Sequence, residues 1–371
     1  MMMIMRAAFG AYLYAAGSNH SFTHLVRMTD STAFPPFPDD IPTHPLLVID
    51  YELIKAGDAA EIDRLWTAGT QLGFWYLKNH GVDVEAGGMF DMAAETMALP
   101  MEEKMKYEQG DDGMSFGYKA AGANAVDATG TKDTVQFINI AKDDALAWPA
   151  QARRAYPSTV NARMDSTIKP FIEKSLAVNN TLLGAFNDRL GLPKGTLLKQ
   201  HPREEFSGSE SRCTFSPPIV DRQVSFLHNR LGGLQVFVPG AESWQYVKPI
   251  PGHAICNLGD AMAIFSGEFS DRISTVNPPG EQGKLYRFSL VYFTRPGNSV
   301  VLRALTDDSP LIAKAVAAAS DPAKYDTGVT AFDWFTRRIK NQRIKNRKGP
   351  ETWMASRGTE HTEHTKVEVS T

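Results

Sequence analysis

The residue pair best suited to bind an anion is Arg287 and Ser289, which lie two positions apart in the apolar stretch YRFSLVYF at 286–293. Alternate residues of a strand share a face, so Arg287 and Ser289 are expected on the same face as Val291 and Phe293. Both faces of this strand are largely apolar, which predicts that it is covered on both sides. A buried guanidinium needs an anionic partner, and a carboxylate fits its fork best. The stretch therefore predicts a carboxylate-binding site, with an internal salt bridge to an Asp or Glu as the alternative.

Composition narrows the class of protein that carries this pair. The chain has 371 residues, 43% of them hydrophobic and 22% charged, which is typical of a globular protein. Its net charge of −3, from 39 basic and 42 acidic residues, argues against a dedicated nucleic-acid binder. Two cysteines support no disulfide framework and favour a reducing, cytoplasmic setting. No run of 18 apolar residues exists, so we expect no membrane span.

Hydrophobic periodicity predicts the elements that position the strand. A strand at 46–50, a helix that begins at Asp58 and a strand at 74–77 form a strand–helix–strand unit. A long helix is predicted over 159–190, with a kink at Pro170, and a last helix begins at Thr330. After residue 210, short strands follow one another, which suggests a sandwich or barrel. These strands are predicted at 233–238, 244–247, 254–257, 262–265 and 287–293.

Three other segments have simpler interpretations. Residues 1–27 are interpreted as a disordered extension or as translation from an upstream methionine, with a weak signal peptide as the alternative. The proline-rich stretch at 34–46 is interpreted as an extended lead-in. The glycine-rich stretch at 110–130 contains no phosphate-binding motif, so we expect a surface or site-covering loop. The basic run at 337–348 is interpreted as a solvated helix end that the helix dipole stabilises.

The order and spacing of several segments resemble one family. The chain is similar to the isopenicillin N synthase-like branch of the iron(II)- and 2-oxoglutarate-dependent dioxygenases, particularly fungal members of natural-product pathways, over about residues 28–358. The segments are PLLVIDYELI (45–54), LGFWYLKNHGV (72–82), NRLGGLQV (229–236), PGHAICNLGD (251–260), NPPGEQ (277–282) and YRFSLVYFTRP (286–296).

This resemblance implies an α+β, mainly β fold: a double-stranded β-helix, or jelly roll, with an N-terminal α/β part and a C-terminal helix. It also implies that Arg287 and Ser289 bind the distal carboxylate of 2-oxoglutarate. The expected organisation is an extension and lead-in (1–40), the α/β part (41–200), the jelly-roll core (201–305), a helical segment (306–349) and a polar tail (350–371).

The iron site is where the resemblance fails. The family holds iron with two histidines and one carboxylate. The positions of the first pair, a His-x-Asp, fall on Pro217 and Ile219, and the position of the second histidine falls on Ile273. The resemblance alone would imply iron(II) and 2-oxoglutarate as cofactors. The residues predict that iron is lost, that no cofactor remains, and that ordinary dioxygenase activity is absent.

Other side chains could in principle rebuild the metal site or act in its place. His228, Asp221, Glu268 and Asp271 are the possible substitute ligands, although none restores the spacing of the family. Low-priority acid–base candidates for the cavity are His228, Tyr286 and Tyr292. The two histidines inside family-like segments, His80 and His253, are expected to be structural.

Several functions remain open. The first is a repurposed pathway enzyme that performs a metal-free cyclisation, isomerisation or dehydration. The others are a non-catalytic protein that binds a ligand or partner, an oxygenase that has decayed or whose coding sequence contains an error, and an oxygenase with an unusual iron site. The expected partner is a small-molecule pathway intermediate or a carboxylate ligand, without nucleic acid or membrane.

Overall fold

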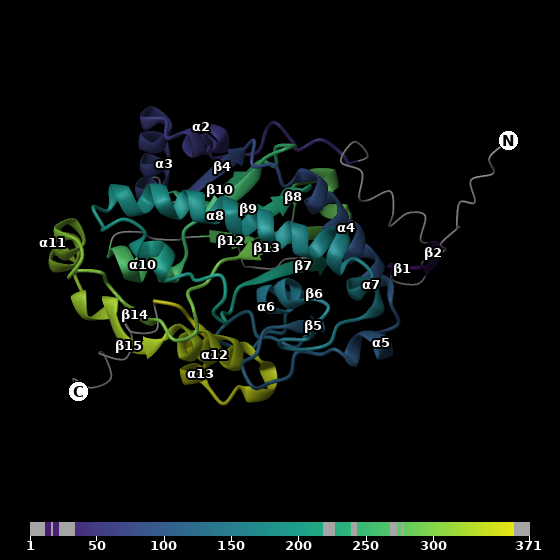
Figure 1. Ribbon diagram of the computed structural model, residues 1–371. Coiled ribbons are helices and arrows are strands. Elements are labelled where there is room, and N and C mark those ends of the chain that lie inside the picture. Colours follow the sequence, from purple (N-terminus) through teal and green to yellow (C-terminus); the bar gives the residue numbers. More distant parts are fainter. Residues whose placement is uncertain are drawn as a thin grey trace.

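The core of the chain is a pair of β-sheets (Figure 1). The structure is a computed structural model, and it describes residues 34–217, 227–238, 243–267 and 278–359, together with the backbone of 12–15, 18–21 and 273–275. The larger sheet has the strand order β3-β4-β11-β8-β13-β7-β6-β5. Its strands are β3 (Val48–Asp50), β4 (Phe74–Lys78), β5 (Gly117–Lys119), β6 (Gln136–Ala141), β7 (Glu210–Ser216), β8 (Leu227–Asn229), β11 (Ala254–Asn257) and β13 (Arg287–Phe293). The smaller sheet, ordered β10-β9-β12, contains β9 (Leu234–Val238), β10 (Ser243–Val247) and β12 (Ile273–Thr275).

Each face of the larger sheet is buried against a different layer. One face, which we call the concave face, packs on the smaller sheet. This apolar layer includes Leu227, Val236, Val247, Ile255 and Val291. The opposite face, the helix face, packs on the helices and belongs to the main hydrophobic core, which includes Phe171, Leu290 and Tyr292. These two buried faces explain why β13 is apolar on both sides, as the sequence predicted.

The N-terminal part extends the larger sheet as the strand–helix–strand pattern predicted. β3 and β4 pair in parallel and are connected by α2 (Tyr51–Ala56) and α3 (Ala59–Gln71). Asp58 caps α3, because its carboxylate accepts a 2.8 Å hydrogen bond from the backbone N–H of Glu61. β4 then pairs with β11 of the later segment. The α/β part and the strand-rich part therefore share one sheet.

The helix face is covered by α4 (Asp83–Ala98) and α8 (Lys169–Arg189), and α8 runs across the sheet in Figure 1. The predicted kink at Pro170 is wrong. Pro170 lies in the first turn of α8, where a proline is tolerated, and a π-helical turn at Met164–Ile168 precedes it. The shorter helices are α5 (Met101–Met105), α6 (Lys142–Ala147), α7 (Ser158–Asn161) and α9 (Thr196–Lys199).

One predicted strand is a helix. Residues 262–265 lie inside α10 (Asp260–Ser266), which ends at Gly267 with φ of 68°. A four-residue apolar run does not distinguish a buried strand from a buried helical turn. Gly259 and Gly267 stand at the two ends of this helix. Gly267 adopts the left-handed conformation that ends a helix without steric cost.

The C-terminal segment packs on the loop at 110–130. It contains β14 (Val301–Arg303), α11 (Pro310–Ala318), β15 (Asp326–Thr330), α12 (Ala331–Gln342) and α13 (Pro350–Ser356), with 3₁₀ turns at Pro322–Tyr325 and Ile344–Asn346. Another 3₁₀ turn, Gly280–Lys284, precedes β13. Thr330 caps α12 as predicted, accepting a 3.1 Å hydrogen bond from the N–H of Asp333. The helix α13 lies within the stretch that was expected to be a polar tail.

The interpretation of the basic run at 337–348 as a solvated helix end is wrong for Arg337 and Arg343. Arg343 is 3% exposed and forms ion pairs with Glu108 and with Asp111, the latter at 2.7 Å. Arg337 donates to the carbonyl oxygen of Ala355 at 2.5 Å. These arginines therefore attach α12 to α13 and to the loop at 110–130.

The proline-rich lead-in is fixed against the body of the chain. The Gln282 side chain donates to the carbonyl of Pro35 at 2.8 Å and accepts from the N–H of Gly232 at 2.9 Å. Phe37 is buried against Gly232, where a Cβ would come within 2.7 Å of the ring. Most of the predicted extension lies outside the described residues, namely residues 1–11, 16–17 and 22–33. Within it, the structure describes a hairpin of β1 (Tyr12–Ala15) and β2 (Ser18–Ser21). No helix in the described part of the chain is long and apolar enough to cross a membrane.

Candidate functional site

Arg287 and Ser289 lie on the concave face of β13, in the middle of the larger sheet. β13 runs antiparallel to β7 on one side and to β8 on the other, and all seven of its residues are buried. Arg287 is 8% exposed and Ser289 is 9% exposed. Val291, which shares their face by alternation, packs in the layer between the sheets. The sequence therefore predicted correctly that this guanidinium is buried and that the serine hydroxyl shares its face.

Neighbouring strands surround these two residues with small polar side chains. Ser216 of β7 lies opposite Arg287, and Thr214 of β7 and Asn229 of β8 lie opposite Ser289 on its two sides. Directly opposed residues of an antiparallel pair share a face and lie about 4.5–5.5 Å apart at Cα. We call Arg287, Ser289, Ser216, Thr214 and Asn229 the polar patch. At the next level of this face, Leu227 and Val291 are apolar, and Arg212 of β7 lies opposite Val291.

Among the described residues, Glu210 is an acidic side chain on the same face, and it pairs with arginines other than Arg287. Glu210 lies opposite Phe293, six residues along β13 from Arg287, which corresponds to about 20 Å. Its carboxylate accepts hydrogen bonds from Ser115 at 2.6 Å and from Arg212 at 3.1 Å, and it forms an ion pair with Arg295 at 3.4 Å. Burial lowers the pKa of Arg295 to about 10, and the carboxylate of Glu210 opposes this shift. Glu210 therefore balances the buried Arg212 and the partly buried Arg295 at the far end of the face.

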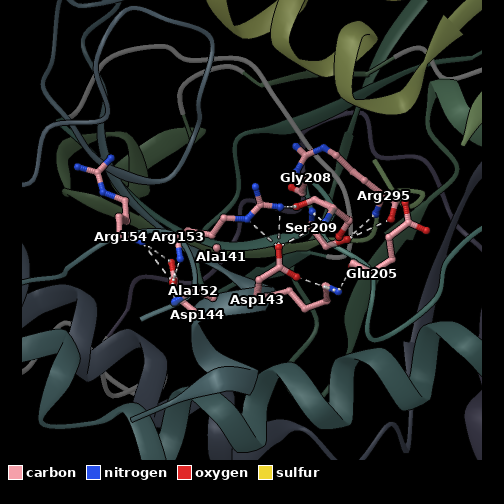
Figure 2. A network of polar contacts seen from close by, with 12 residues as sticks. Ala141, Asp143, Asp144, Ala152, Arg153, Arg154, Glu205, Gly208, Ser209 and Arg295 are labelled. Atoms are coloured by element: carbon pink, nitrogen blue, oxygen red, sulfur yellow. Dashed lines mark hydrogen bonds and ion pairs between the residues drawn. The ribbon is translucent and has the colours of Figure 1, made fainter. Parts of the chain in front are cut away.

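A second network of polar contacts, which includes Asp143, Arg153 and Ser209, lies near the same end of the sheet (Figure 2). Asp143 accepts two hydrogen bonds from Arg153, at 2.9 and 2.8 Å. The carboxylate of Asp144 accepts hydrogen bonds from backbone N–H groups of the loop after α6, among them a 3.0 Å bond from Ala152. Lys142 donates to the carbonyl of Glu205 at 2.8 Å. These acids are satisfied by the scaffold, so the network is structural, and the sequence patterns gave no sign of it.

The three acid–base candidates do not lie on the face of the polar patch. His228 is opposite Leu290, and its ring lies 6.1 Å from that of Phe171 on α8. Tyr292 lies 6.3 Å from the same phenylalanine ring. Tyr286 stacks on Phe215 at 5.1 Å, beside the core residue Phe288. The structure therefore does not bring His228, Tyr292 or Tyr286 together with Arg287.

Burial also makes His228 and Tyr292 poor proton-transfer groups. Desolvation lowers the pKa of His228 to about 3, and the neighbouring His80 contributes to the decrease. Desolvation raises the pKa of Tyr292 well above its usual range. The rings of His80 and His228 lie 5.3 Å apart, and His80 Nδ1 accepts the N–H of Val82 at 3.2 Å. Both histidines are part of the packed layer between sheet and helices.

The positions expected for iron ligands carry no ligating side chain. Pro217 follows directly on β7, Ile273 lies on β12 opposite Val236, and Ile219 lies outside the described residues. Proline and isoleucine side chains contain no oxygen, nitrogen or sulfur donor, so these residues do not fit an iron ion. Within the described ranges, no group of three His, Cys, Asp or Glu side chains could hold a metal ion. The substitute ligands Asp221, Glu268 and Asp271 lie outside those ranges.

Comparison with known proteins agrees with this architecture. A family model for the N-terminal part of a non-haem dioxygenase in morphine synthesis matches residues 46–159, and the model of the 2OG-Fe(II) oxygenase superfamily matches residues 209–296. The 2-oxoglutarate-dependent dioxygenase frbH of Dothideomycetidae sp. is 25% identical over 70% of this chain and 84% of its own length. Gibberellin 20 oxidase 2 of Oryza sativa is 28% identical over 69% of each chain.

A solved structure extends the likeness to the fold. A full-length protein of Neurospora crassa, crystallised in complex with alpha-KG, has a TM-score of 0.63 and 19% sequence identity, and the match covers 81% of this chain and 97% of the Neurospora chain. The expected jelly-roll core with helices is thus confirmed. The two family models follow each other in the order that the fold requires and together cover just over half of the residues, so this chain belongs to the 2OG-Fe(II) oxygenase superfamily.

Proposed function

We propose that this protein binds a small dicarboxylate of the 2-oxoglutarate type at the polar patch and acts on a natural-product intermediate without iron-dependent oxygen chemistry. The observation that carries the proposal is the position of Arg287 and Ser289 side by side on the buried concave face. An arginine presents two parallel N–H donors to a carboxylate, and this charge-assisted pair is among the strongest hydrogen-bonding arrangements. The adjacent hydroxyl adds a third donor.

The substrate class is supported by the names of the relatives. They include the gibberellin oxidase of rice and a flavone synthase of Petroselinum crispum, which is 25% identical over 74% of this chain. Each of these names denotes a small organic product. We extend that class, and no particular compound, to this chain.

Loss of iron chemistry is supported by the donor set. Pro217 and Ile273 stand at two of the positions where the family resemblance expects iron ligands, and their side chains contain no oxygen, nitrogen or sulfur donor. Within the described residues, no group of three His, Cys, Asp or Glu side chains could hold a metal ion.

A second candidate function is non-catalytic binding of the same ligand class. The observation in its favour is that His228, Tyr286 and Tyr292 all lie on the helix face, away from Arg287. A metal-free enzyme would then depend on positioning and hydrogen bonds from the polar patch alone. Turnover of a pathway intermediate by the purified protein would separate the enzyme from the binding protein.

The test is metal and ligand binding by the purified full chain. We expect no stoichiometric iron(II) under anaerobic conditions, measured by metal analysis and by visible absorption with and without 2-oxoglutarate. Calorimetry should detect dicarboxylate binding that Arg287→Ala abolishes and that Arg287→Lys weakens, because lysine keeps the charge but loses the fork. Arg303→Ala, at an exposed arginine of β14, is the matched control and should bind as the wild type does.

Two results would contradict the proposal. A stoichiometric iron–2-oxoglutarate chromophore would mean that iron is held by other residues. Unchanged dicarboxylate affinity in Arg287→Ala would remove the polar patch from the binding site. Ile273→His alone should not produce turnover, because the first ligand pair would still be missing; turnover in that variant would show that the first pair has been misassigned.

A further inference from the structure

We infer that Asn229 is a specificity-determining residue of the polar patch, and that it selects a dicarboxylate that carries a hydroxyl or amino group. This inference rests on the proposed dicarboxylate site and adds to it the class of ligand. Asn229 belongs to β8, which is far from β13 in the sequence and adjacent to it in the sheet. The resemblance that indicated Arg287 and Ser289 assigned no role to it.

The orientation of Asn229 follows from its neighbours on the strand. Leu227, two residues earlier, packs in the layer between the two sheets. His228 and Arg230, the residues on either side of Asn229, contact rings of the opposite face: His228 lies near Phe171, and the Arg230 guanidinium lies 4.3 Å from the ring centroid of Phe90. Alternation therefore directs the Asn229 side chain to the concave face, beside Ser289.

The Asn229 amide has an unused acceptor at this place. Its Oδ1 atom is buried and accepts no hydrogen bond from any residue in the part of the chain that the structure describes. A buried polar atom without a partner has lost its hydrogen bonds to water, so a partner is expected when the site is in use. Because Oδ1 is an acceptor, its complement is a donor, such as a hydroxyl or an ammonium group.

The distance between Asn229 and the pair of Arg287 and Ser289 allows one short ligand to contact all three residues. Asn229 lies directly opposite Ser289, about 5 Å away at Cα. Arg287 lies two residues along β13, about 7 Å further at Cα. A ligand whose carboxylate is held by Arg287 and Ser289 can thus present a hydroxyl on its short carbon chain to Asn229. At the next level Leu227 and Val291 are apolar, and the guanidinium of Arg212, opposite Val291, donates to Asn139 and Glu210.

The test compares ligands that differ by one group. Glutarate and 2-hydroxyglutarate share a skeleton and both carboxylates, and only the second carries a donor at carbon 2. Calorimetry on the purified full chain should give 2-hydroxyglutarate a dissociation constant about 2- to 13-fold lower than that of glutarate, the worth of one neutral hydrogen bond. Asn229→Leu, which has a similar volume and no polar atom, should bring the ratio close to one while glutarate affinity is retained.

A matched control uses Asn257, another asparagine on the concave face. Asn257 of β11 also has a buried Oδ1 without a described partner, but it lies about 13 Å from Asn229 along the strands, because Ile255 pairs with Leu227. Asn257→Leu should keep the ligand ratio of the wild type. Asn229→Ala, checked for folding by circular dichroism, replaces Asn229→Leu if leucine is not tolerated.

The outcomes separate this inference from the proposed function. If Arg287-dependent binding is present but Asn229→Leu keeps the wild-type ratio, the inference is wrong and the dicarboxylate site stands; an ordered water would then satisfy Asn229. If Asn257→Leu also brings the ratio of the two dissociation constants close to one, the inference is overturned, because the effect is then not specific to Asn229. Failure of every dicarboxylate to bind the wild type would overturn the proposed site and this inference together.

Discussion

Replacing His228 by leucine should make the stability of the protein less sensitive to acid. His228 is buried between sheet and helices, where desolvation first and His80 second lower its pKa to about 3 from an unfolded value of 6.5. Because the folded pKa is the lower one, the unfolded chain binds the additional proton, and stability is lost as the pH falls below 6.5. Each pH unit in this window removes up to about 1.4 kcal/mol.

The size of the effect follows from the two pKa values. Between pH 7 and pH 5 a group that shifts from 6.5 to about 3 lowers the free energy of unfolding by about 2 kcal/mol. In the wild type His80, whose pKa burial also lowers, adds to this loss. His228→Leu should therefore lose about 2 kcal/mol less than the wild type over the same interval, although its stability at pH 7 is set by packing.

Urea unfolding at pH 7, 6, 5.5 and 5 measures this difference directly. Tyr292→Phe is the control, because it changes the same packed layer without removing a group that titrates in this range. The control should follow the pH dependence of the wild type. If His228→Leu and the wild type lose stability in parallel, the histidine is not held neutral by burial and the reasoning is refuted.

Three further perturbations test the scaffold around the polar patch. Glu210→Gln should destabilise the fold by about 3–5 kcal/mol in urea titrations, because it leaves the buried Arg212 and the partly buried Arg295 without their anion; a loss under about 1 kcal/mol would contradict this. Arg343→Ala should remove a buried ion-pair anchor and accelerate amide hydrogen exchange in the loop at 110–130; unchanged exchange there would show that the arginine does not hold the loop. Gly232→Ala should cost about 1–3 kcal/mol because the new methyl group meets the Phe37 ring, and Phe37→Ala should relieve most of that cost in a double-mutant cycle; additive effects would contradict the contact.

The local patterns of the sequence were sufficient for elements whose own residues carry the signal. The capping residues Asp58 and Thr330 begin helices in the structure, and the alternation in 286–293 gives a strand that is buried on both faces. These features depend on neighbours within a few positions, where propensity and spacing act directly. The predicted strand at 262–265 failed because four apolar residues fit either a strand or a helical turn.

The partners of charged and polar side chains depend on the tertiary structure. The basic run at 337–348 looks like a solvent-exposed surface in the sequence, yet Arg343 is buried by carboxylates more than 230 positions earlier in the chain. His228, a candidate for the cavity, faces the helices, and its neighbour Asn229 faces Ser289. A shift of one residue along a strand reverses the face, so the sequence of β8 alone could not decide between the two.

Residue types and alternation predicted that Arg287 and Ser289 share one face of a doubly covered strand, and the family resemblance predicted that the iron-ligand positions fall on proline and isoleucine. Both statements concern residue identity and alternation, which the chain carries locally. Only the tertiary structure decided that Ser216, Thr214 and Asn229 join this pair, because β7 and β8 reach β13 through hydrogen bonds between segments about 60 to 75 positions apart in the sequence.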